Sequence, residues 1–374
     1  MGISAFAHLL PPAAPASSTS GCAGVLDIST AAPLHEAWRE ALKGIGRTHP
    51  NPPVGCVIVD DDGTIIARGF HEKAGERHAE IKALDALAPG AARGKTVVVT
   101  LEPCTHHGRT PPCVDRLLDE GVSRVVVGAI DPNPRVHQQG VRRLRAAGVD
   151  VVIAEGADAL RCQALIAPFA TTQQLARPYV VLKTATSLDG KVATRTGSSR
   201  GITGPASRAL VHALRDAVDA VVVGADTVLA DDPALTVRDL PGRDPLRVIL
   251  DRHARVPRSA RVFADDNVCV LGLASISDVL KELHRRGLLA VLVEAGPRLA
   301  AAFLQADVVD ELWWFHAPLL VGNDGLSAVD FGQVDHIQQA PRFDVVTRAE
   351  VGNDGLTVLG GGLWQRPTLS VRAG

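Results

Sequence analysis

Residues 96–104 read Thr-Val-Val-Val-Thr-Leu-Glu-Pro-Cys, and this stretch decides the fold of the first half of the chain. Its first five residues are all β-branched, a composition typical of a strand buried in a parallel sheet. Cys104 follows this strand closely. Because open α/β sheets place their ligand sites at the carboxyl ends of their strands, we expect an α/β domain with a functional site beside Cys104.

Predicted strands and helices alternate on both sides of this stretch. In the first half, hydrophobic periodicity predicts strands at 54–59, 65–70, 125–127 and 151–153, and helices at 34–45, 78–87, 112–120 and 141–147. After an expected junction at 163–178, it predicts strands at 179–183, 220–223, 247–250, 268–271, 289–293 and 311–316, and helices at 207–215, 278–286 and 298–306. Such alternation indicates α/β layer architecture.

The length of 374 residues suggests two domains. We expect the first at residues 34–176 and the second at 177–374. Residues 1–33 are rich in Ala, Pro, Ser and Gly and carry one charge, so we expect a flexible N-terminal extension. The first sixteen residues lack the basic region of a signal peptide, which favours a cytoplasmic protein.

The composition argues against several classes of partner. Lys and Arg total 39 against 41 Asp and Glu, and neither half is a basic module, which argues against nucleic acid. No apolar run is long enough to span a bilayer, so we expect no membrane partner. Six cysteines are sparse for this length, which fits a reducing compartment better than a disulfide scaffold.

The strongest chemical pattern is His78-Ala-Glu80 together with Cys104 and Cys113. A catalytic zinc site takes three protein ligands and leaves one position for water, and one imidazole with two thiolates fits that count. Glu80 can transfer protons without binding the metal. Zinc deaminases carry H-x-E and P-C-x-x-C, but here the second cysteine lies nine residues after the first. A closed structural zinc site, with His106 or His107 as the fourth ligand, is the alternative.

The second half contains no G-x-G-x-x-G that follows a strand and opens a helix. Two of its predicted strands instead run into glycine-containing turns, at Gly224-Ala-Asp-Thr227 and at Glu294-Ala-Gly-Pro297. A glycine turn that opens a helix is a ready anion site, because free backbone N–H groups point out of the helix. These two turns could therefore hold a pyrophosphate.

Longer strings resemble the bifunctional deaminase–reductase family of riboflavin biosynthesis over residues 34 to 360. In the first half they are His78-Ala-Glu80, Thr-His-Pro-Asn-Pro-Pro-Val-Gly at 48–55 and Leu-Glu-Pro-Cys-Thr-His-His-Gly-Arg-Thr-Pro-Pro-Cys at 101–113. In the second half they are Lys183-x3-Ser187-Leu-Asp-Gly190, the stretch 227–238 and the turn 294–297. This family has the same gap between its two cysteines.

The resemblance implies a cytidine-deaminase-like three-layer sandwich, followed by a dihydrofolate-reductase-like domain. It implies zinc-dependent hydrolytic deamination of 2,5-diamino-6-ribosylamino-4(3H)-pyrimidinone 5′-phosphate. It further implies NADPH-dependent reduction of the ribosyl group of 5-amino-6-(5-phosphoribosylamino)uracil to ribityl. The protein would be both a hydrolase and an oxidoreductase, act on phosphorylated pyrimidines, and form a homodimer through the reductase domain.

The resemblance also assigns residues. It implies His78, Cys104 and Cys113 as zinc ligands, Glu80 as the catalytic proton carrier, and Asn51, His71 and Arg109 as substrate contacts, with His49 and His106 as further candidates. At NADPH it places Ala185, Gly201, Thr227, Asp231, Gly296, Pro297, Arg298, Leu299, Ala300, Ala301 and Ala302. At the substrate of the reductase it places Ser199, Arg215, Leu235, Arg238 and Glu294.

One position departs from the family. Gly201 stands where the family usually has a tryptophan that packs on the nicotinamide cofactor, and Arg200 is a candidate to cover the site instead. This departure leaves one alternative open, a monofunctional deaminase with a non-catalytic reductase-like domain. The sequence also leaves open a deaminase that acts on RNA or free nucleobases, and a zinc-stabilised binding protein without enzymatic activity.

Overall fold

A computed structural model describes residues 3–11, 28–105, 111–134, 136–330 and 335–360. The chain forms two compact units, and the boundary between them falls after Ala176. Unit 2 is Pro15–Ala176, while unit 1 combines Arg177–Gly374 with Met1–Ala14 at the start of the chain. Among the helices in the described ranges, none is long and apolar enough to cross a membrane.

A five-stranded sheet forms the middle of unit 2. Its strand order is β2-β1-β3-β4-β5, with bounds β1 (Gly55–Val59), β2 (Ile65–Phe70), β3 (Thr96–Val99), β4 (Arg124–Val127) and β5 (Asp150–Ile153). β1 runs antiparallel to both of its neighbours, while β3, β4 and β5 are parallel. The start of the stretch at 96–104 thus forms β3, the central strand that its composition predicts.

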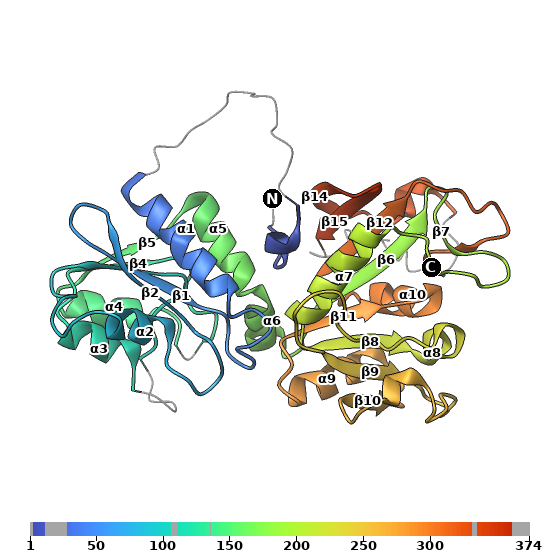
Figure 1. The fold of residues 1–374 in the computed structure, drawn as a ribbon, viewed down its shortest axis with the longest axis horizontal. Helices are drawn as coiled ribbons and strands as arrows, with labels where there is room; N and C mark the ends of the chain where they lie inside the picture. The colour runs from blue at the N-terminus through green and yellow to red at the C-terminus, as the bar shows by residue number, and fades with distance from the viewer. Residues whose placement is uncertain (1–2, 12–27, 106–110, 135, 331–334, 361–374) are drawn as a thin grey trace, which may run out of the picture. The chain divides into compact units, whose positions relative to one another are not determined.

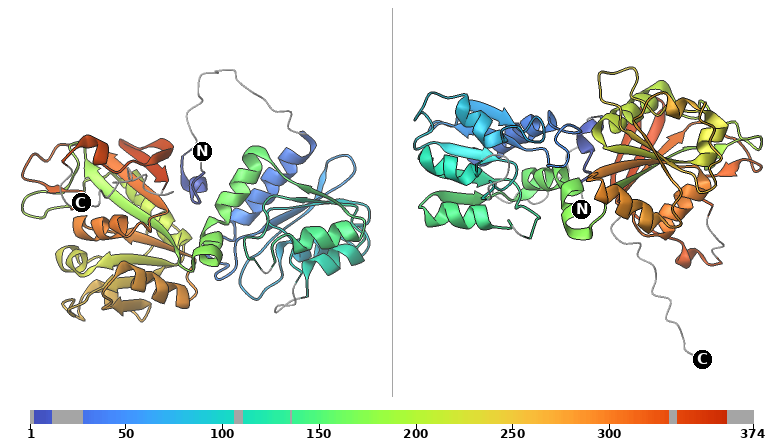
Figure 2. Two further views of the ribbon diagram at one scale, coloured as in Figure 1. Left: turned by 180° about the vertical axis from the view of Figure 1, so that it is seen from behind. Right: turned by 90° about the horizontal axis from the view of Figure 1, so that it is seen from below.

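Helices cover both faces of this sheet (Figures 1 and 2). On one face, α1 (Ile28–Leu42) and α5 (Gly156–Leu165) share a core with Val57, Val98 and Val126. On the other face, α2 (Ala79–Asp85), α3 (Cys113–Asp119) and α4 (Gln139–Ala146) pack on the alternate strand residues. Successive strand side chains point to opposite faces, so unit 2 is a three-layer sandwich. The expected junction at 163–178 is largely helical, because α6 (Ala167–Leu175) follows α5.

An eight-stranded sheet forms unit 1. Its order is β10-β9-β8-β11-β6-β12-β15-β14, and the strands from β10 to β12 are parallel. The bounds are β6 (Tyr179–Ser187), β8 (Ala220–Gly224), β9 (Leu246–Leu250), β10 (Val268–Leu271), β11 (Ala290–Glu294), β12 (Glu311–Ala317), β14 (Asp344–Val351) and β15 (Asp354–Gly360). Hydrophobic periodicity does not predict the antiparallel pair β14–β15. β7 (Lys191–Ala193) pairs with β13 (Leu326–Ser327) in a small separate ribbon.

In the described part of unit 1, four α-helices accompany this sheet: α7 (Pro205–Ala217), α8 (Ala225–Asp231), α9 (Ile276–Arg285) and α10 (Pro297–Gln305). Two short 3-10 turns, η2 (Arg261–Phe263) and η3 (Ile337–Gln339), lie between the elements. α8 begins directly after β8, and α10 begins a few residues after β11. Because β8 and β11 are adjacent and parallel, their glycine turns reach the same edge of the sheet.

The start of the chain packs on unit 1. Ser4, Ala5 and Phe6 are buried, and the turn η1 (Ala7–Leu9) follows them. The buried carboxylate of Glu311 accepts hydrogen bonds from the Ser4 hydroxyl at 2.8 Å and the Ala5 backbone N–H at 2.6 Å. The Tyr179 hydroxyl and the Trp313 indole N–H also donate to Glu311, each at 2.8 Å.

The expectation of a flexible extension over residues 1–33 is therefore incorrect for this first segment. Its composition is poor in charge, but the Ser4–Phe6 stretch satisfies a buried carboxylate that lies more than 300 residues away. The composition of a segment cannot predict a contact with so distant a residue. The expected helix at 34–45 also begins earlier, since α1 starts at Ile28 and contains Pro33.

Ser4→Ala should lower the free energy of unfolding of unit 1 by about 1 kcal/mol, because it removes one donor to a buried carboxylate. Glu311→Ala should cost about 2–4 kcal/mol, since it leaves the buried donors of Tyr179 and Trp313 without a partner. Chemical denaturation followed by tryptophan fluorescence measures both. The exposed Glu350→Ala is the matched control, with an expected change within about 0.5 kcal/mol. A Ser4→Ala variant as stable as the wild type would contradict the docked segment.

Candidate functional site

A close contact between β2 and α2 positions the deaminase-like site. A Cβ atom added at Gly69 would lie 2.3 Å from the carbonyl oxygen of Ala79 and 2.5 Å from the backbone nitrogen of Ala83. Only glycine therefore lets α2 lie this close to the sheet. His78 is the N-cap residue of that helix, and Glu80 lies in its first turn.

His78, Cys104 and Cys113 come together at this helix end, with all their potential ligand atoms within 4.8 Å of one another. His78 Nδ1 lies 3.2 Å from Cys113 Sγ and 3.6 Å from Cys104 Sγ. Tetrahedral zinc, with bonds of about 2.1 Å to nitrogen and 2.3 Å to sulfur, separates its ligand atoms by roughly 3.5–3.8 Å. The three residues therefore fit a zinc ion.

The surroundings favour an anionic sulfur on Cys104. A hydrogen bond from the Cys113 thiol lowers the pKa of Cys104, and His78 adds to this effect against the opposing effect of burial. The backbone N–H of Cys113 also donates to Cys104 Sγ at 3.3 Å. The thiolate is the form of cysteine that binds metals.

Glu80 and a chain of hydrogen-bonded groups accompany the cluster. Glu80 is buried, and burial raises the pKa of its carboxyl group. His71 Nδ1 lies 3.3 Å from the carbonyl oxygen of Arg77, and His71 Nε2 lies 3.1 Å from Asn51 Nδ2. A carbonyl oxygen only accepts, so Nδ1 carries the proton and Nε2 accepts from the Asn51 amide. Burial lowers the pKa of His71, which keeps the ring in this neutral form.

Glu102 is a buried residue that the sequence analysis does not single out. Its carboxylate accepts backbone N–H groups from Asp131 at 3.2 Å, Gln138 at 3.0 Å and Val141 at 3.2 Å. It thereby ties the segment that carries Cys104 to the loop that follows β4. One feature of the sequence could have indicated its role: Glu102 is a charged residue at the end of an apolar run, directly before Pro103-Cys104. Arg109 and His106 lie outside the described residues.

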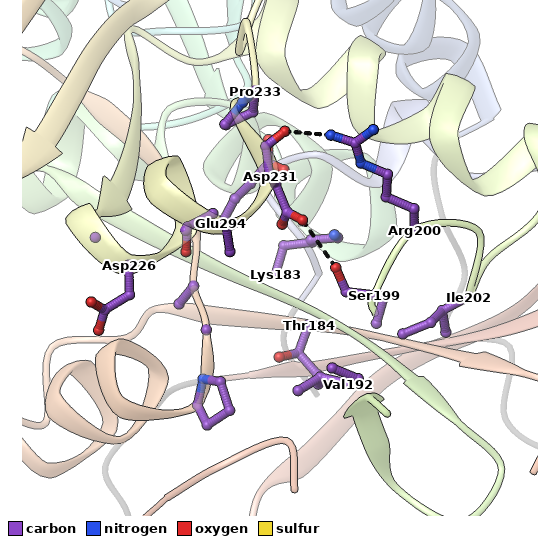
Figure 3. A pocket seen from close by; sticks show the side chains of 18 of the residues that line it. Lys183, Thr184, Val192, Ser199, Arg200, Ile202, Asp226, Asp231, Pro233 and Glu294 are labelled. Atoms are coloured by element: carbon purple, nitrogen blue, oxygen red, sulfur yellow. Dashed lines mark hydrogen bonds between the residues drawn. The ribbon is translucent and has the colours of Figure 1, made fainter. Parts of the chain in front are cut away.

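A cavity of about 1180 Å³ lies in unit 1, at the carboxyl ends of its parallel strands (Figure 3). Most of the predicted reductase residues line it: Ala185, Ser199, Gly201, Arg215, Thr227, Asp231, Arg238, Glu294, Gly296, Pro297, Arg298 and Leu299. The side chains of Leu235, Ala300 and Ala301 are instead buried, and Ala302 is partly buried further along α10. The two predicted anion-binding turns meet here, because a Cβ atom on Gly296 would lie 3.8 Å from Thr227 Oγ1.

Three charged side chains lie together beside this cavity. Arg215 Nε donates to Glu294 Oε1 at 2.6 Å, and Arg215 Nη1 donates to the carbonyl oxygen of Thr236 at 2.9 Å. Burial opposes ionisation of Glu294, but the positive charges of Arg215 and Lys183 outweigh burial and lower the pKa of Glu294 to about 2. Burial lowers the pKa of Lys183. Lys183 is not a predicted site residue, although a lysine that ends the apolar run Tyr-Val-Val-Leu is a visible signal.

The loop around Gly201 has an open conformation. Gly201 adopts φ +82°, and a Cβ atom there would meet nothing within 4 Å. The neighbouring residues bind the end of α8: Ser199 Oγ donates to Asp231 Oδ1 at 3.2 Å, and Arg200 Nη2 donates to the carbonyl oxygen of Asp231 at 2.7 Å (Figure 3). Arg200 and Gly201 both line the cavity.

The metal-binding cluster of unit 2 and the cavity of unit 1 indicate the class of protein. It is a bifunctional enzyme in which a zinc-dependent deaminase domain is joined to a reductase domain. Residues 30–129 match the family described as cytidine and deoxycytidylate deaminase zinc-binding region, and residues 178–356 match the RibD C-terminal domain. Riboflavin biosynthesis protein RibD of Aquifex aeolicus is 42% identical over 316 residues, covering 78% of this chain and 87% of that protein. The Escherichia coli protein of the same name is 38% identical over 357 residues, covering 86% and 96%.

Comparison with solved structures leads to the same family as comparison with known sequences. The chain matches Acinetobacter baumannii RibD with a TM-score of 0.83 and 37% identity, covering 89% of this chain and 98% of that one. A Thermotoga maritima structure named as a diaminohydroxyphosphoribosylaminopyrimidine deaminase and 5-amino-6-(5-phosphoribosylamino)uracil reductase matches with a TM-score of 0.82, at the same identity and coverage.

The chain belongs to the RibD family of riboflavin biosynthesis proteins. It is a deaminase that depends on zinc and a reductase that uses NADPH, and the predicted bifunctional enzyme is confirmed. A deaminase with a non-catalytic second domain is not favoured, because the second half matches the reductase domain of the family.

Arg215→Ala should destabilise unit 1 by about 3–5 kcal/mol, because it removes the ion-pair partner of the buried Glu294 carboxylate. The exposed Arg208→Ala is the control and should cost less than about 1 kcal/mol. The ion pair depresses the pKa of Glu294 in the folded state, so its contribution is present above the unfolded value of 4.5 and is lost as the pH falls towards 2. Urea denaturation at pH 7 and pH 3 should show a gap between variant and wild type that narrows in acid. An equal gap at both pH values would contradict the ion pair.

Proposed function

We propose that the first unit along the chain, unit 2, deaminates 2,5-diamino-6-ribosylamino-4(3H)-pyrimidinone 5′-phosphate. Unit 1 then reduces the ribosyl group of 5-amino-6-(5-phosphoribosylamino)uracil to ribityl. The observation that carries the deaminase assignment is the convergence of His78, Cys104 and Cys113 beside the buried Glu80. The name of the Thermotoga maritima relative supports both substrates.

We propose His78 Nδ1 and the sulfurs of Cys104 and Cys113 as the zinc ligands. Zinc, when bound, supplies Lewis-acid activation of the water that attacks the ring carbon bearing the amine. The Glu80 carboxylate accepts a proton from this water and later donates it to the leaving nitrogen, which departs as ammonia. Oxygen from water replaces nitrogen on the ring, so the step needs no other reactant.

Asn51 is proposed to orient the pyrimidine. Its amide nitrogen donates to the neutral His71, so its amide oxygen is directed to accept from an N–H group of the substrate. His71 is then a positioning residue for Asn51 as well as a candidate substrate contact. Arg109, outside the described residues, remains a proposed contact for the base or the phosphate.

Glu80→Gln should slow deamination by about 100-fold or more, because the amide keeps the size of the side chain but cannot accept the proton. Ammonia release measures the rate, and metal analysis checks that zinc is retained. The exposed Glu76→Gln in the same unit is the matched control and should leave the rate unchanged. Full deaminase activity in Glu80→Gln would remove Glu80 from the mechanism.

In unit 1 we propose that NADPH binds across α8 and α10. The cofactor supplies the hydride, and the protein holds it in place. The α10 N-terminus, from Gly296 through Pro297, Arg298 and Leu299 to the Ala300–Ala302 turn, would receive the pyrophosphate. Thr227 and Asp231 would contact the cofactor from α8, and Ala185 and Gly201 from the other side of the cavity.

The reductase substrate is proposed to lie against Ser199, Arg215, Leu235, Arg238 and Glu294. Arg238 is exposed at the cavity wall, whereas Arg215 is already bound to Glu294 and to Thr236. We therefore propose Arg238 as the main ligand of the substrate phosphate, since a guanidinium binds phosphate through two parallel hydrogen bonds. The Leu235 side chain is buried, so Leu235 would contribute through its backbone.

Purified protein given the deaminated ribosyl intermediate should oxidise NADPH, because this experiment supplies unit 1 with its proposed substrate directly. Absorbance at the nicotinamide band measures the rate. The Glu80→Gln variant is the control and should oxidise NADPH at the wild-type rate, since its change lies in the other unit. If the protein still deaminates its first substrate but does not oxidise NADPH, the result would support the alternative that the second domain is non-catalytic.

We also propose a homodimer formed through unit 1 in the cytoplasm. β14 is an edge strand of the sheet with exposed apolar side chains such as Val345, and edge strands offer unpaired backbone groups to a second copy. A reducing compartment keeps thiolate ligands available. Light scattering on the eluted protein should give twice the chain mass of 39.3 kDa, and a monomer mass would contradict the dimer.

A further inference from the structure

The carboxylate of Glu102 binds one continuous segment of unit 2 with both of its oxygens. Glu102 lies two residues before Cys104 and is 5% exposed. Its Oε2 accepts the backbone N–H groups of Asp131 at 3.2 Å and Gln138 at 3.0 Å, and its Oε1 accepts that of Val141 at 3.2 Å. Glu102 is thereby fixed to the loop after β4 and to the first turn of α4.

The backbone of this segment also packs tightly against the start of α4. A Cβ atom added at Gly140 would lie 2.2 Å from the carbonyl oxygen of Pro103 and 3.2 Å from Glu102 Oε1, so only glycine fits there. The Pro103 carbonyl belongs to the peptide bond that leads to Cys104. The start of α4 therefore determines where this peptide bond lies.

Cys104 is held on its other side by the start of α3. The backbone N–H of Val114 donates to the carbonyl oxygen of Cys104 at 3.2 Å, and the backbone N–H of Cys113 donates to Cys104 Sγ at 3.3 Å. All of these contacts join protein groups, so they can hold Cys104 Sγ in place before a metal ion binds.

The backbone of Gln138 gives independent support for the importance of this arrangement. Gln138 adopts φ +58°, a left-handed conformation that residues other than glycine rarely adopt. Such local strain persists where the surrounding structure enforces it. The side chain of Gln138 is exposed, whereas its backbone N–H binds the buried Glu102 carboxylate, so this hydrogen bond is a contact that sustains the conformation.

We propose that Glu102 is a positioning residue for the zinc site: through the start of α4 it holds the Pro103–Cys104 peptide so that Cys104 Sγ lies ready beside His78 Nδ1 and Cys113 Sγ. This inference rests on the proposed zinc ligands of unit 2. Glu102 neither binds the metal nor transfers a proton in this assignment. A metal site needs its ligand atoms held to within roughly 0.5 Å, so a small shift of Cys104 should weaken zinc binding.

The chemistry of three N–H donors explains why the residue is a carboxylate. An ionised carboxylate only accepts hydrogen bonds, and its two oxygens offer about four acceptor positions. The amide of a glutamine has one carbonyl oxygen, and its NH2 group donates. Glu102→Gln would therefore direct donors at donors on one side of the group, while the size of the side chain stays the same.

Zinc affinity of the full chain, measured by competition with a coloured chelator, tests the proposal. Glu102→Gln should weaken zinc binding by about 10- to 100-fold, as changes behind metal ligands typically do. Gly140→Ala should weaken it as well, because it keeps the carboxylate but displaces the Pro103 carbonyl. Gln138→Gly should leave zinc affinity unchanged, since glycine keeps the N–H and suits φ +58°. The exposed Glu155→Gln is the matched control and should also leave it unchanged.

Replacement of zinc by Co²⁺ separates positioning from a general loss of stability. A tetrahedral Co²⁺ site with thiolate ligands absorbs visible light, and its bands depend on the geometry of the metal–sulfur bonds. Folded Glu102→Gln and Gly140→Ala proteins should show weaker or shifted bands than the wild type. A purely structural role of Glu102 would lower the stability and leave the spectrum of the folded protein unchanged.

Hydrogen exchange in the wild type gives a readout that needs no variant. After zinc is removed with a chelator, the amides of Gln138 and Val141 should remain protected, because Glu102 binds them without the metal. Free exchange of both amides in the metal-free protein would overturn the proposal. This measurement also decides the question if a variant fails to fold.

The two levels of failure give different results. If the wild type binds zinc but Glu102→Gln and Gly140→Ala match its affinity and its cobalt spectrum, the positioning role of Glu102 is wrong and the zinc ligands stand. If the wild type itself binds no zinc, the proposed zinc site of His78, Cys104 and Cys113 fails, and the role of Glu102 fails with it.

Discussion

Parallel strands deliver the segments that follow them to one edge of a sheet, and both sites of this protein depend on that constraint. In unit 2, Cys104 follows β3, and the close approach of α2 to β2 at Gly69 brings His78 to the same place. In unit 1, β8 and β11 bring the Gly224 and Gly296 turns together at one cavity. Each site therefore takes its residues from segments far apart in the chain.

Buried carboxylates secure these arrangements. Glu102 accepts two backbone N–H groups from the loop after β4 and one from α4, Glu311 accepts four donors that include the start of the chain, and Glu294 pairs with Arg215. Each negative charge is compensated by several donors or by a cation, which is the condition for burying a charge without a large loss of stability. Two of these carboxylates also bear on the sites, because Glu102 fixes the segment that carries Cys104 and Glu294 lines the cavity of unit 1.

Local patterns in the sequence predict the parts that depend on near neighbours. β2 and β10 lie at their predicted bounds, and side-chain chemistry predicts the cluster of His78, Cys104 and Cys113 that the structure brings together. Contacts between distant segments cannot be predicted from these local patterns. Ser4 binds Glu311, and Glu102 binds a loop some 30 residues away, but neither pairing leaves a periodic trace in the sequence. The edge pair β14–β15 escapes prediction for a related reason, because half-exposed strands lack the apolar run of a buried one.

Gly201 shows why a single position cannot be interpreted alone. Its φ of +82° belongs to a backbone region that residues other than glycine rarely adopt, so glycine suits the conformation of this loop. Arg200 and Ser199 fasten this loop to Asp231, which keeps the cavity bounded on that side. The glycine turns after β8 and β11 line the same cavity as this loop, so the two sides of the cavity are held by separate segments of unit 1.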